Sequence, residues 1–491
     1  MSFHSFDYLL FLPLAVLAFF ATPHRWRWLV IVAASYGFYA AWRIEFGLLL
    51  LASTVIDYAA ALGMEGARTK RRRGLWLGLS LAFNLGMLFF FKYFAWVQSG
   101  LGEALVGAGA VEAFEPSDII LPLGISFYTF QTISYSVDVF RGKRPAERHF
   151  GYLAAYVAFF PQLLAGPIER STGLLPQLRT EQHFDRARAA AGLFLMGVGY
   201  FKKLVIADRI ALFAPTVLAD PLGFDPWQVM IAPFAMIYQV YCDLSGYTDI
   251  ALGSALILGI KLSRNFNRPF AARTMRQFWN RWHMTVMRFF RDYVYTPMAR
   301  RFPSRAMRNF AGGLTLLLAA LWHGATLAWV AVAALAFALQ LAERLLHNAR
   351  RSLSGRVAWR PGRASRVLVA AAARIGGAVY IWTFLAFVGL LVGVPDLATA
   401  GAALRHGAEA AAIPEAGDWL AGTRLIRSDL AILFIAVAVL ELHQAIEARR
   451  PTHQLLRAAP TPVRWGVYYA LGLSILMFGV YGKATFVYFL I

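Results

Sequence analysis

Long hydrophobic runs alternate along this chain with short polar stretches rich in Arg and Lys. An apolar run of about 20 residues can cross a bilayer as a helix, because the hydrocarbon core is about 30 Å thick. The pattern therefore predicts an all-α, polytopic membrane protein with roughly eleven spanning helices. They are expected near residues 8–22, 28–44, 46–63, 74–98, 119–140, 190–215, 227–260, 314–342, 367–394, 428–446 and 465–482.

Two segments of the chain do not fit a regular crossing. The apolar run 150–167 contains Pro161 and Pro167, so it is either a short span or a re-entrant element. Residues 261–308 carry twelve Lys or Arg and one acid, which is too basic for a lipid-embedded helix. We expect this second segment to lie along the membrane interface or to dip into the protein.

The basic clusters predict how the chain is oriented. Clustered Lys and Arg near helix ends stay in the cytoplasm. The clusters at 68–73 and 344–366 are therefore expected to be cytoplasmic, while the loop 99–118 carries acids and no basic residue, as an external loop does. Counting back through the predicted helices places the N-terminus outside, in the periplasm of a bacterial inner membrane.

Composition narrows the class of protein further. Of the 491 residues, 59% are hydrophobic and only 15% are charged, which excludes a soluble domain of this length. The net charge of +21 follows the loops between apolar runs and comes with no nucleic-acid recognition motif, so nucleic-acid binding is not expected. The single cysteine, Cys242, excludes an intrachain disulfide and cysteine-ligated metal sites; no metal site is predicted.

His323 is the first candidate for chemistry. It lies inside a run without Asp, Glu, Lys or Arg between Arg308 and Glu343, and an ionisable residue at membrane depth is costly enough to suggest function. An apolar surround favours neutral imidazole, the state that a general base needs to take a proton from a hydroxyl. The alternative is a neutral histidine that forms a hydrogen bond between helices.

His283 and the basic segment around it form the second candidate. Arg276, Arg281 and Arg288 either face lipid headgroups and water, or bind the phosphates of an anionic substrate. His283 either supports such a site or takes part in the chemistry directly. The residues alone leave both alternatives open.

A third group of polar residues interrupts the apolar pattern between 243 and 267. Asp243, Ser245 and Tyr247 must be paired or face a cavity, so they either fix a helix break or line a reaction tunnel. Asn265 and Asn267 are typical of a turn stabilised by Asn side chains, and are also candidate substrate-binding residues.

Several short sequences occur together in one order. They read PLGISFYTFQTISYSVDVFRG, FFPQLLAGPIER, DLSGYTDIALG, NFNRPF, FWNRWHMT, FRDYVYTPM and LWHGATLAW, and the chain ends in FVYFLI. This series resembles the membrane-bound O-acyltransferases, and within them the branch typified by the membrane subunit of alginate O-acetylation. The resemblance covers roughly residues 120 to 330 of a single membrane domain, with N-terminal helices in 1–98 and C-terminal helices in 367–491.

The resemblance implies a function. It implies a tunnel through the helix bundle, acetyl-coenzyme A as the donor substrate with no bound cofactor, and His323 in the position of the family's catalytic histidine. His283 resembles the family's second histidine. The implied acceptor is an exopolysaccharide such as alginate, or a cell-wall glycan, and a periplasmic hydrolase-like partner with a serine nucleophile would complete the transfer.

Other functions stay open from the sequence. The chain reads TPMARRFPSR where relatives commonly carry a Gly-Gly stretch, so specificity housed in that loop is not transferable. The acceptor could instead be a lipid or a secreted protein. A transporter that uses His323 as a proton-relay residue, or a non-catalytic scaffold, are the alternatives from other classes.

Overall fold

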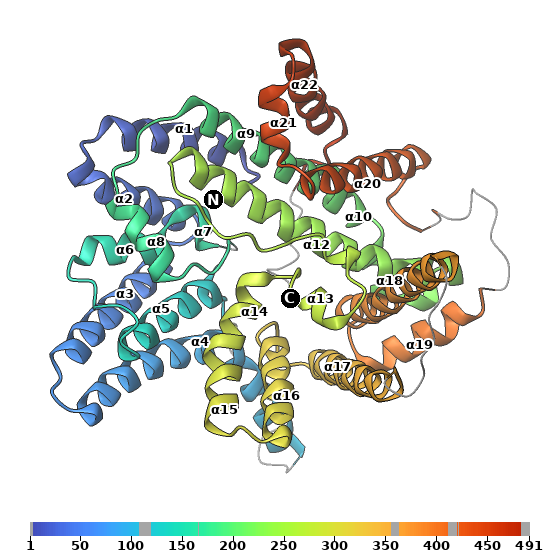
Figure 1. Ribbon diagram of the computed structural model, residues 1–491, viewed down its shortest axis with the longest axis horizontal. Coiled ribbons are helices and arrows are strands. Elements are labelled where there is room, and N and C mark those ends of the chain that lie inside the picture. Colours follow the sequence, from blue (N-terminus) through green and yellow to red (C-terminus); the bar gives the residue numbers. More distant parts are fainter. Residues whose placement is uncertain are drawn as a thin grey trace. The chain divides into compact units, whose positions relative to one another are not determined.

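The computed structural model of the protein describes residues 3–107, 119–164, 166–354, 363–410, 420 and 422–482. Helices connected by short turns make up this part of the chain, and it contains no strand (Figure 1). The all-α prediction is confirmed. Contacts between residues group the chain into two compact units, 1–200 with 247–264 and 201–246 with 265–491. The prediction of a single membrane domain over 1–491 stays a prediction.

The first unit contains the N-terminal helices. Within it, α3 packs against α4 and α5, and α2 packs against α6. Its elements are α1 (Phe6–Ala21), η1 (His24–Trp26), α2 (Arg27–Ala40), α3 (Ile44–Gly66), α4 (Lys70–Gly107), α5 (Ile125–Phe140), α6 (Phe150–Ala158), α7 (Phe160–Leu163), α8 (Ser171–Arg179), α9 (Arg186–Tyr200) and the C-terminal part of α12 (Pro226–Ile257).

A buried polar cluster joins three helices of this first unit. Asn84 Nδ2 on α4 donates to both carboxylate oxygens of Asp57 on α3, at 3.2 and 3.0 Å. Ser136 Oγ on α5 donates to the same carboxylate at 3.1 Å, and Ser80 Oγ on α4 contacts it as well. All four side chains are fully buried, so the hydrogen bonds replace the water that the carboxylate loses.

The second unit contains the rest of α12 and the C-terminal helices. Within it α16 and α17 lie side by side and α17 contacts α18 (Figure 1). Its further elements are the π-helix η2 (Phe201–Ala207), α10 (Asp208–Ile210), α11 (Ala214–Ala219), η3 (Pro221–Gly223), η4 (Pro269–Ala271), α13 (Met275–Trp279), α14 (Met284–Phe290), the π-helix η5 (Arg291–Tyr295), α15 (Thr296–Arg301), α16 (Arg305–Leu321), α17 (Leu327–Ser354), α18 (Arg363–Gly393), α19 (Leu397–Ala408), α20 (Arg427–Glu447), α21 (Thr452–Ala458) and α22 (Thr461–Phe478).

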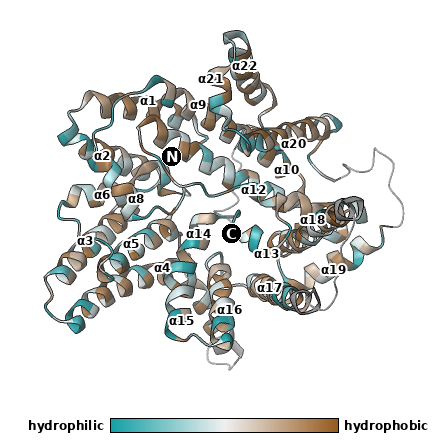
Figure 2. Ribbon diagram, in the orientation of Figure 1, coloured by the Kyte–Doolittle hydropathy of each residue, from teal (hydrophilic) through white to brown (hydrophobic). Residues whose placement is uncertain are grey.

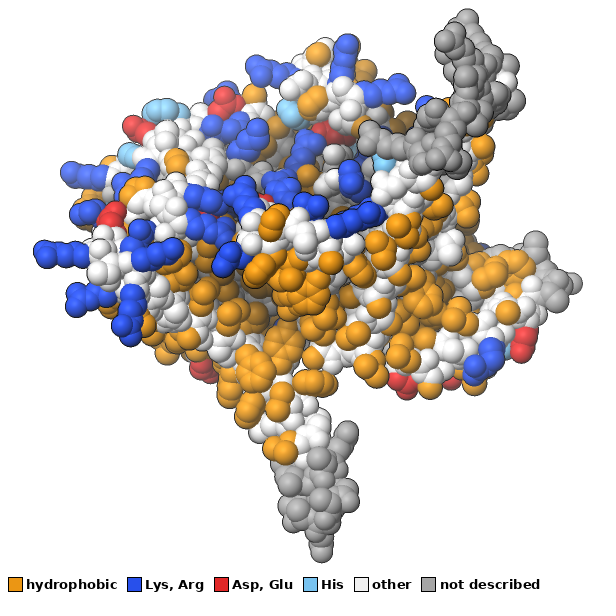
Figure 3. Space-filling model, turned by 60° about the horizontal axis from the view of Figure 1, so that its bottom comes forward, with side chains coloured by type: hydrophobic (Ala, Val, Ile, Leu, Met, Phe, Trp, Pro, Cys, Tyr) orange, Lys and Arg blue, Asp and Glu red, His pale blue; other side chains and the backbone are white. Residues whose placement is uncertain are grey.

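Six helical segments of the described chain are long and apolar enough to cross a membrane: Ile44–Gly66, Lys70–Leu101, Arg186–Ala219, Leu327–Ala349, Val369–Gly393 and Arg427–Glu447. Large apolar side chains on these helices point outward; Leu48 is 68% exposed and Phe434 is 76% exposed. Hydrophobic residues predominate along many of the helical ribbons (Figure 2). On the face that Figure 3 shows, many Lys and Arg side chains lie apart from a broad apolar area. The chain is therefore a multi-pass membrane protein, and the predicted count of eleven spans stays a prediction.

One predicted crossing is wrong in its continuity, and a second segment breaks as predicted. The run 314–342 is two helices, because α16 ends at Leu321 and α17 begins at Leu327. The run 150–167 breaks at Phe159, between α6 and the short α7 that contains Pro161. In the first case the apolar pattern continues through the turn, so periodicity could not reveal it. In the second the proline indicated a break, as expected.

Candidate functional site

Two loop segments of the second unit pair with each other around His283. Asn267 N donates to Arg281 O at 2.9 Å, and Met284 N donates to Asn265 O at 2.8 Å. The side-chain Oδ1 of Asn265 accepts from Thr285 N at 3.2 Å and from Thr285 Oγ1 at 2.6 Å. Asn265 and Asn267 of the NFNRPF segment are therefore bound to the segment that carries His283.

His283 occupies an unusual backbone conformation. Its φ of 43° and ψ of 50° lie in the left-handed region, at the N-cap position of α14. Such a conformation costs a non-glycine residue of order 1–3 kcal/mol, so surrounding contacts must hold it. The buried imidazole forms no capping hydrogen bond to α14. Its ring centroid lies 5.7 Å from that of Phe266 and 5.7 Å from that of Trp322.

His323 lies in the turn between α16 and α17. Its backbone N donates to Ala320 O at 2.9 Å, which closes the last turn of α16. The imidazole stacks on Trp329 at a centroid distance of 4.4 Å and an interplanar angle of 16°, and Trp322 contacts it at 4.7 Å. Because Trp322 also contacts His283, one indole ring joins the two histidines.

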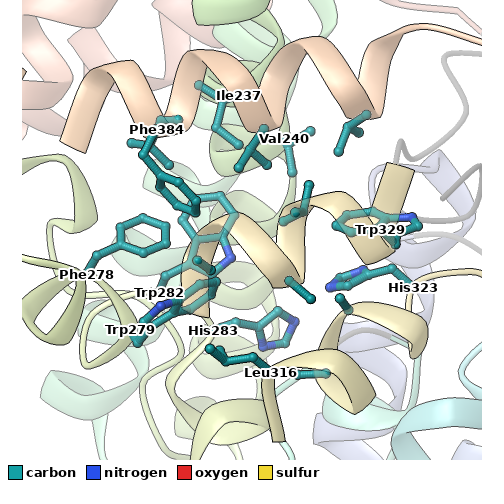
Figure 4. Close-up of a pocket in the computed structure, with 18 of the residues that line it drawn as sticks. Ile237, Val240, Phe278, Trp279, Trp282, His283, Leu316, His323, Trp329 and Phe384 are labelled. Atoms are coloured by element: carbon teal, nitrogen blue, oxygen red, sulfur yellow. The ribbon is translucent and has the colours of Figure 1, made fainter. Parts of the chain in front are cut away.

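Both histidines line one cavity (Figure 4). The cavity lies among α12, α13, α14, α16, α17 and α18 and contains about 960 Å³ of space outside atoms, its open part included. Apart from the two imidazoles its walls are apolar and aromatic, with side chains such as Ile237, Phe278 and Phe384. Four tryptophans, Trp279, Trp282, Trp322 and Trp329, contribute to the walls as well.

The surroundings keep His283 neutral. Burial lowers the pKa of His283 from 6.5 to about 3, because a charged imidazolium would lose its hydration in this apolar site. A neutral ring has one nitrogen that can accept a proton and one that donates. The cavity thus provides polar ring nitrogens inside an otherwise apolar space.

Asp243 and Ser245 bind lysines of η2 in the second unit. Lys203 Nζ lies 2.6 Å from Asp243 Oδ1 and 2.9 Å from Asp208 Oδ1, and all three side chains are buried. Lys202 Nζ donates to Ser245 Oγ at 2.7 Å. These contacts tie the π-helix to α12, whose residues Met236, Ile237, Val240 and Leu244 form part of the cavity wall.

The other predicted site residues lie elsewhere. Tyr247 belongs to the first unit, where its ring stacks on Phe3 at 4.4 Å. Arg276 is exposed, while Arg281 and Arg288 are half-buried. None of these four residues lines the cavity, and neither do Asn265 and Asn267. The binding roles predicted for them stay predictions.

Some residues of the site escaped the sequence reasoning. Trp322 and Trp329 flank His323 in the sequence, but an aromatic residue in an apolar run is most simply explained by packing. Lys202 and Lys203 interrupt the predicted span 190–215, and charged residues within a span could have identified them. Thr285 carries no local signal, since only its pairing with Asn265 makes it significant.

The fold and the site define a class: a helical, multi-pass membrane protein whose cavity is lined by two histidines and four tryptophans. Residues 145–388 match the membrane-bound O-acyltransferase family, and this range contains both histidines. The chain belongs to that family.

Relatives of known name support this assignment. The chain is 39% identical over 323 residues to the "Probable alginate O-acetylase" of Azotobacter vinelandii, covering 64% of this chain and 63% of that protein. It is 37% identical over 328 residues to the protein of the same name from Pseudomonas aeruginosa, covering 65% and 61%. It is 34% identical over 352 residues to the "Peptidoglycan O-acetyltransferase" of Helicobacter pylori, covering 64% and 65%. The chain thus spans less than two thirds of the length of these relatives.

Proposed function

We propose that this protein is an O-acyltransferase that takes an acetyl group from acetyl-coenzyme A and delivers it for O-acetylation of an exopolysaccharide or a cell-wall glycan. The observation that carries the proposal is the meeting of His283 and His323, from two separate turns, in one apolar cavity. The names of the relatives support the reaction class and both kinds of acceptor.

In this proposal His323 is the general base. The acceptor hydroxyl oxygen attacks the thioester carbonyl carbon while neutral His323 takes the hydroxyl proton. The carbon–sulfur bond then breaks, and the leaving thiolate of coenzyme A receives that proton from the imidazolium. Atoms and charges balance without a cofactor. Trp329, stacked on the imidazole at 4.4 Å, fixes the ring plane, and His283 supports the polar end of the substrate.

The proposal also assigns a direction to the transfer of the acetyl group across the membrane. Arg276, Arg281 and Arg288 bind the phosphates of the donor on the cytoplasmic side, where Arg offers paired N–H groups and a permanent charge. The acceptor, with a periplasmic hydrolase-like partner, lies on the other side of a bacterial inner membrane, and the N-terminus is periplasmic. The clusters of Lys and Arg support this orientation.

The test is coenzyme A release by the purified protein in detergent, with acetylation of the glycan as a second readout. His323→Ala should lower turnover by about 10²–10⁴-fold, the usual contribution of a general base. His323→Gln keeps polarity and much of the volume but cannot act as a base, so it should be equally inactive. Near-normal turnover by His323→Gln, normalised to the protein in the membrane, would contradict the assignment and direct the search to His283.

One observation favours a second candidate. Lys203 and Asp208 are buried charged residues in a segment long enough to span the membrane, and Lys203 also contacts the buried Asp243 of α12. Such residues often mark ion pathways in transporters. A transporter needs a gradient across a membrane, whereas acyl transfer does not. Release of coenzyme A in detergent decides between the two.

A further inference from the structure

Asn265 performs a function for α14 that the residue at the start of a helix normally performs itself. A typical N-cap side chain accepts the N–H of the second or third helical residue. His283 occupies the N-cap position and makes no such bond. The Oδ1 of Asn265 accepts the N–H of Thr285 instead, at 3.2 Å, and the hydroxyl of Thr285 at 2.6 Å.

This contact also explains how the strained backbone is held. Among the described residues, the non-glycine residues with positive φ are Arg268 and His283. Both lie within the two paired segments, and Arg281 Nη1 donates to Arg268 O at 3.4 Å. Asn265 accepts three hydrogen bonds from the two residues that directly follow His283. The left-handed turn is thus fixed from the partner segment.

Burial makes the arrangement specific to an amide. Asn265 is only 1% exposed, and its Nδ2 has no hydrogen-bond partner in the described part of the chain. An aspartate here would bury a charge, and a serine would be too short to reach both groups of Thr285. An amide supplies the acceptor while remaining neutral.

We propose that Asn265 and Thr285 form a clamp that positions His283 in the cavity, so that Asn265 is a positioning residue and not a substrate ligand. The inference rests on the proposed acyl transfer for its effect on activity, but its effect on His283 itself can be measured without activity.

The first test compares substitutions of Thr285, which does not line the cavity. Thr285→Val keeps the shape and removes the hydroxyl donor, whereas Thr285→Ser keeps the donor. We expect Thr285→Val to lower kcat by about 10²-fold at unchanged KM for acetyl-coenzyme A, the effect of a small misplacement at a reacting centre. Thr285→Ser should restore most of the loss. Equal kcat values for Val and Ser would overturn the clamp.

Thr315→Val is the matched control. Thr315 is also buried in the second unit, but its hydroxyl donates within α16, to Ala311 O at 2.6 Å. If the loss of any buried hydroxyl lowered kcat, Thr315→Val would lower kcat as much as Thr285→Val does. A positioning effect should also vanish when its target is gone, so Asn265→Ala should cost nothing further in a His283→Ala background. If the losses of activity from Asn265→Ala and His283→Ala add, Asn265 acts on a residue other than His283.

The second test reads His283 directly. Diethyl pyrocarbonate modifies accessible histidines, and mass spectrometry reports the rate at each site. His283 is 4% exposed, so it should react slowly in the natural protein and several times faster in Asn265→Ala and Thr285→Val. The exposed His453 serves as the internal reference. If the natural protein shows no turnover, the proposed function fails, but the rate of modification at His283 still tests the clamp. Unchanged rates at His283 in both variants would refute the clamp.

Discussion

At the scale of single residues, the two histidines have distinct environments. His323 stacks on one tryptophan in a turn between two helices, while His283 is enclosed by the clamp and by aromatic rings. Neutral imidazole is favoured where water is excluded, and a base has to be neutral before it can act. Enclosure of the imidazole therefore keeps it neutral, as a base must be, and lowers the stability of the folded protein at low pH.

Burial of His283 predicts that the stability of the folded protein depends on pH. In the unfolded chain His283 binds a proton below about pH 6.5, whereas burial lowers its pKa in the folded protein to about 3. The unfolded state thus binds more protons between these values, and stability falls as the pH drops below about 6.5, by at most about 1.4 kcal/mol per pH unit. Above that range both states are neutral and the effect disappears.

Thermal unfolding in detergent at about pH 7 and about pH 5 measures this effect. His283→Gln should lose less stability between the two pH values than the natural protein does. His453→Gln, a substitution of an exposed histidine, is the control and should run parallel to the natural protein. Parallel curves for His283→Gln as well would show that burial of His283 carries no such cost.

The arginines give a second prediction at this scale. If Arg276 and Arg288 bind donor phosphates, replacing either by Gln should raise KM for acetyl-coenzyme A by about tenfold, the value of one charge-assisted hydrogen bond, with kcat little changed. Arg281→Gln should also lower stability, because Arg281 donates to Arg268 O. Arg449→Gln, at an exposed arginine beyond α20, is the control. A fall in protein abundance with unchanged KM would favour contact with lipid headgroups.

At the scale of elements, α12 forms one wall of the cavity. The contacts of Lys203 with Asp243 and of Lys202 with Ser245 hold it against η2. On α18, Gly389 lies so close to α12 that an added Cβ would clash with Pro233 O. Since Gly389 also lines the cavity, the close approach of these two helices sets part of its shape.

Gly389→Ala should therefore force α12 and α18 apart. We expect a loss of about 1–3 kcal/mol of stability, typical of overpacking, together with lower turnover. Gly376→Ala on the same helix is the matched control, because an added Cβ there meets no atom within 4 Å. Its effect should be neutral or slightly stabilising, as alanine favours helix. Equal unfolding temperatures for the two variants would show that the helices are not in close contact in the membrane.

At the scale of the whole molecule, the basic clusters predict topology. In a Cys242→Ala background, a membrane-impermeant maleimide applied from outside should label Glu112→Cys but neither Lys70→Cys nor Gly355→Cys. Positions 112 and 355 lie outside the described residues. Permeabilised cells, in which all three should react, provide the control. Labelling of position 70 from outside would invert the orientation, and with it the assigned side of the donor.

The sequence by itself determined the helical class and the membrane, and it identified the two histidines as candidates. Hydrophobic runs are a local property, and a helix in lipid satisfies its own backbone, so the pattern of single residues is sufficient to predict a protein with several spanning helices. His323 was detectable because a polar ring in an uncharged run is rare. The resemblance carried by the short motifs added the family, which the match over residues 145–388 bears out.

Only the tertiary structure decided what these residues do together. The turn at 322–326 is invisible in the apolar pattern, yet it brings His323 against Trp322 and Trp329. Asn265 pairs with Thr285, 20 residues away, and Lys203 with Asp243, 40 residues away, so two candidate ligands also bind other side chains of the protein. Hydrogen bonds and cavities depend on distances in space between segments remote in the chain, and no local periodicity encodes those distances.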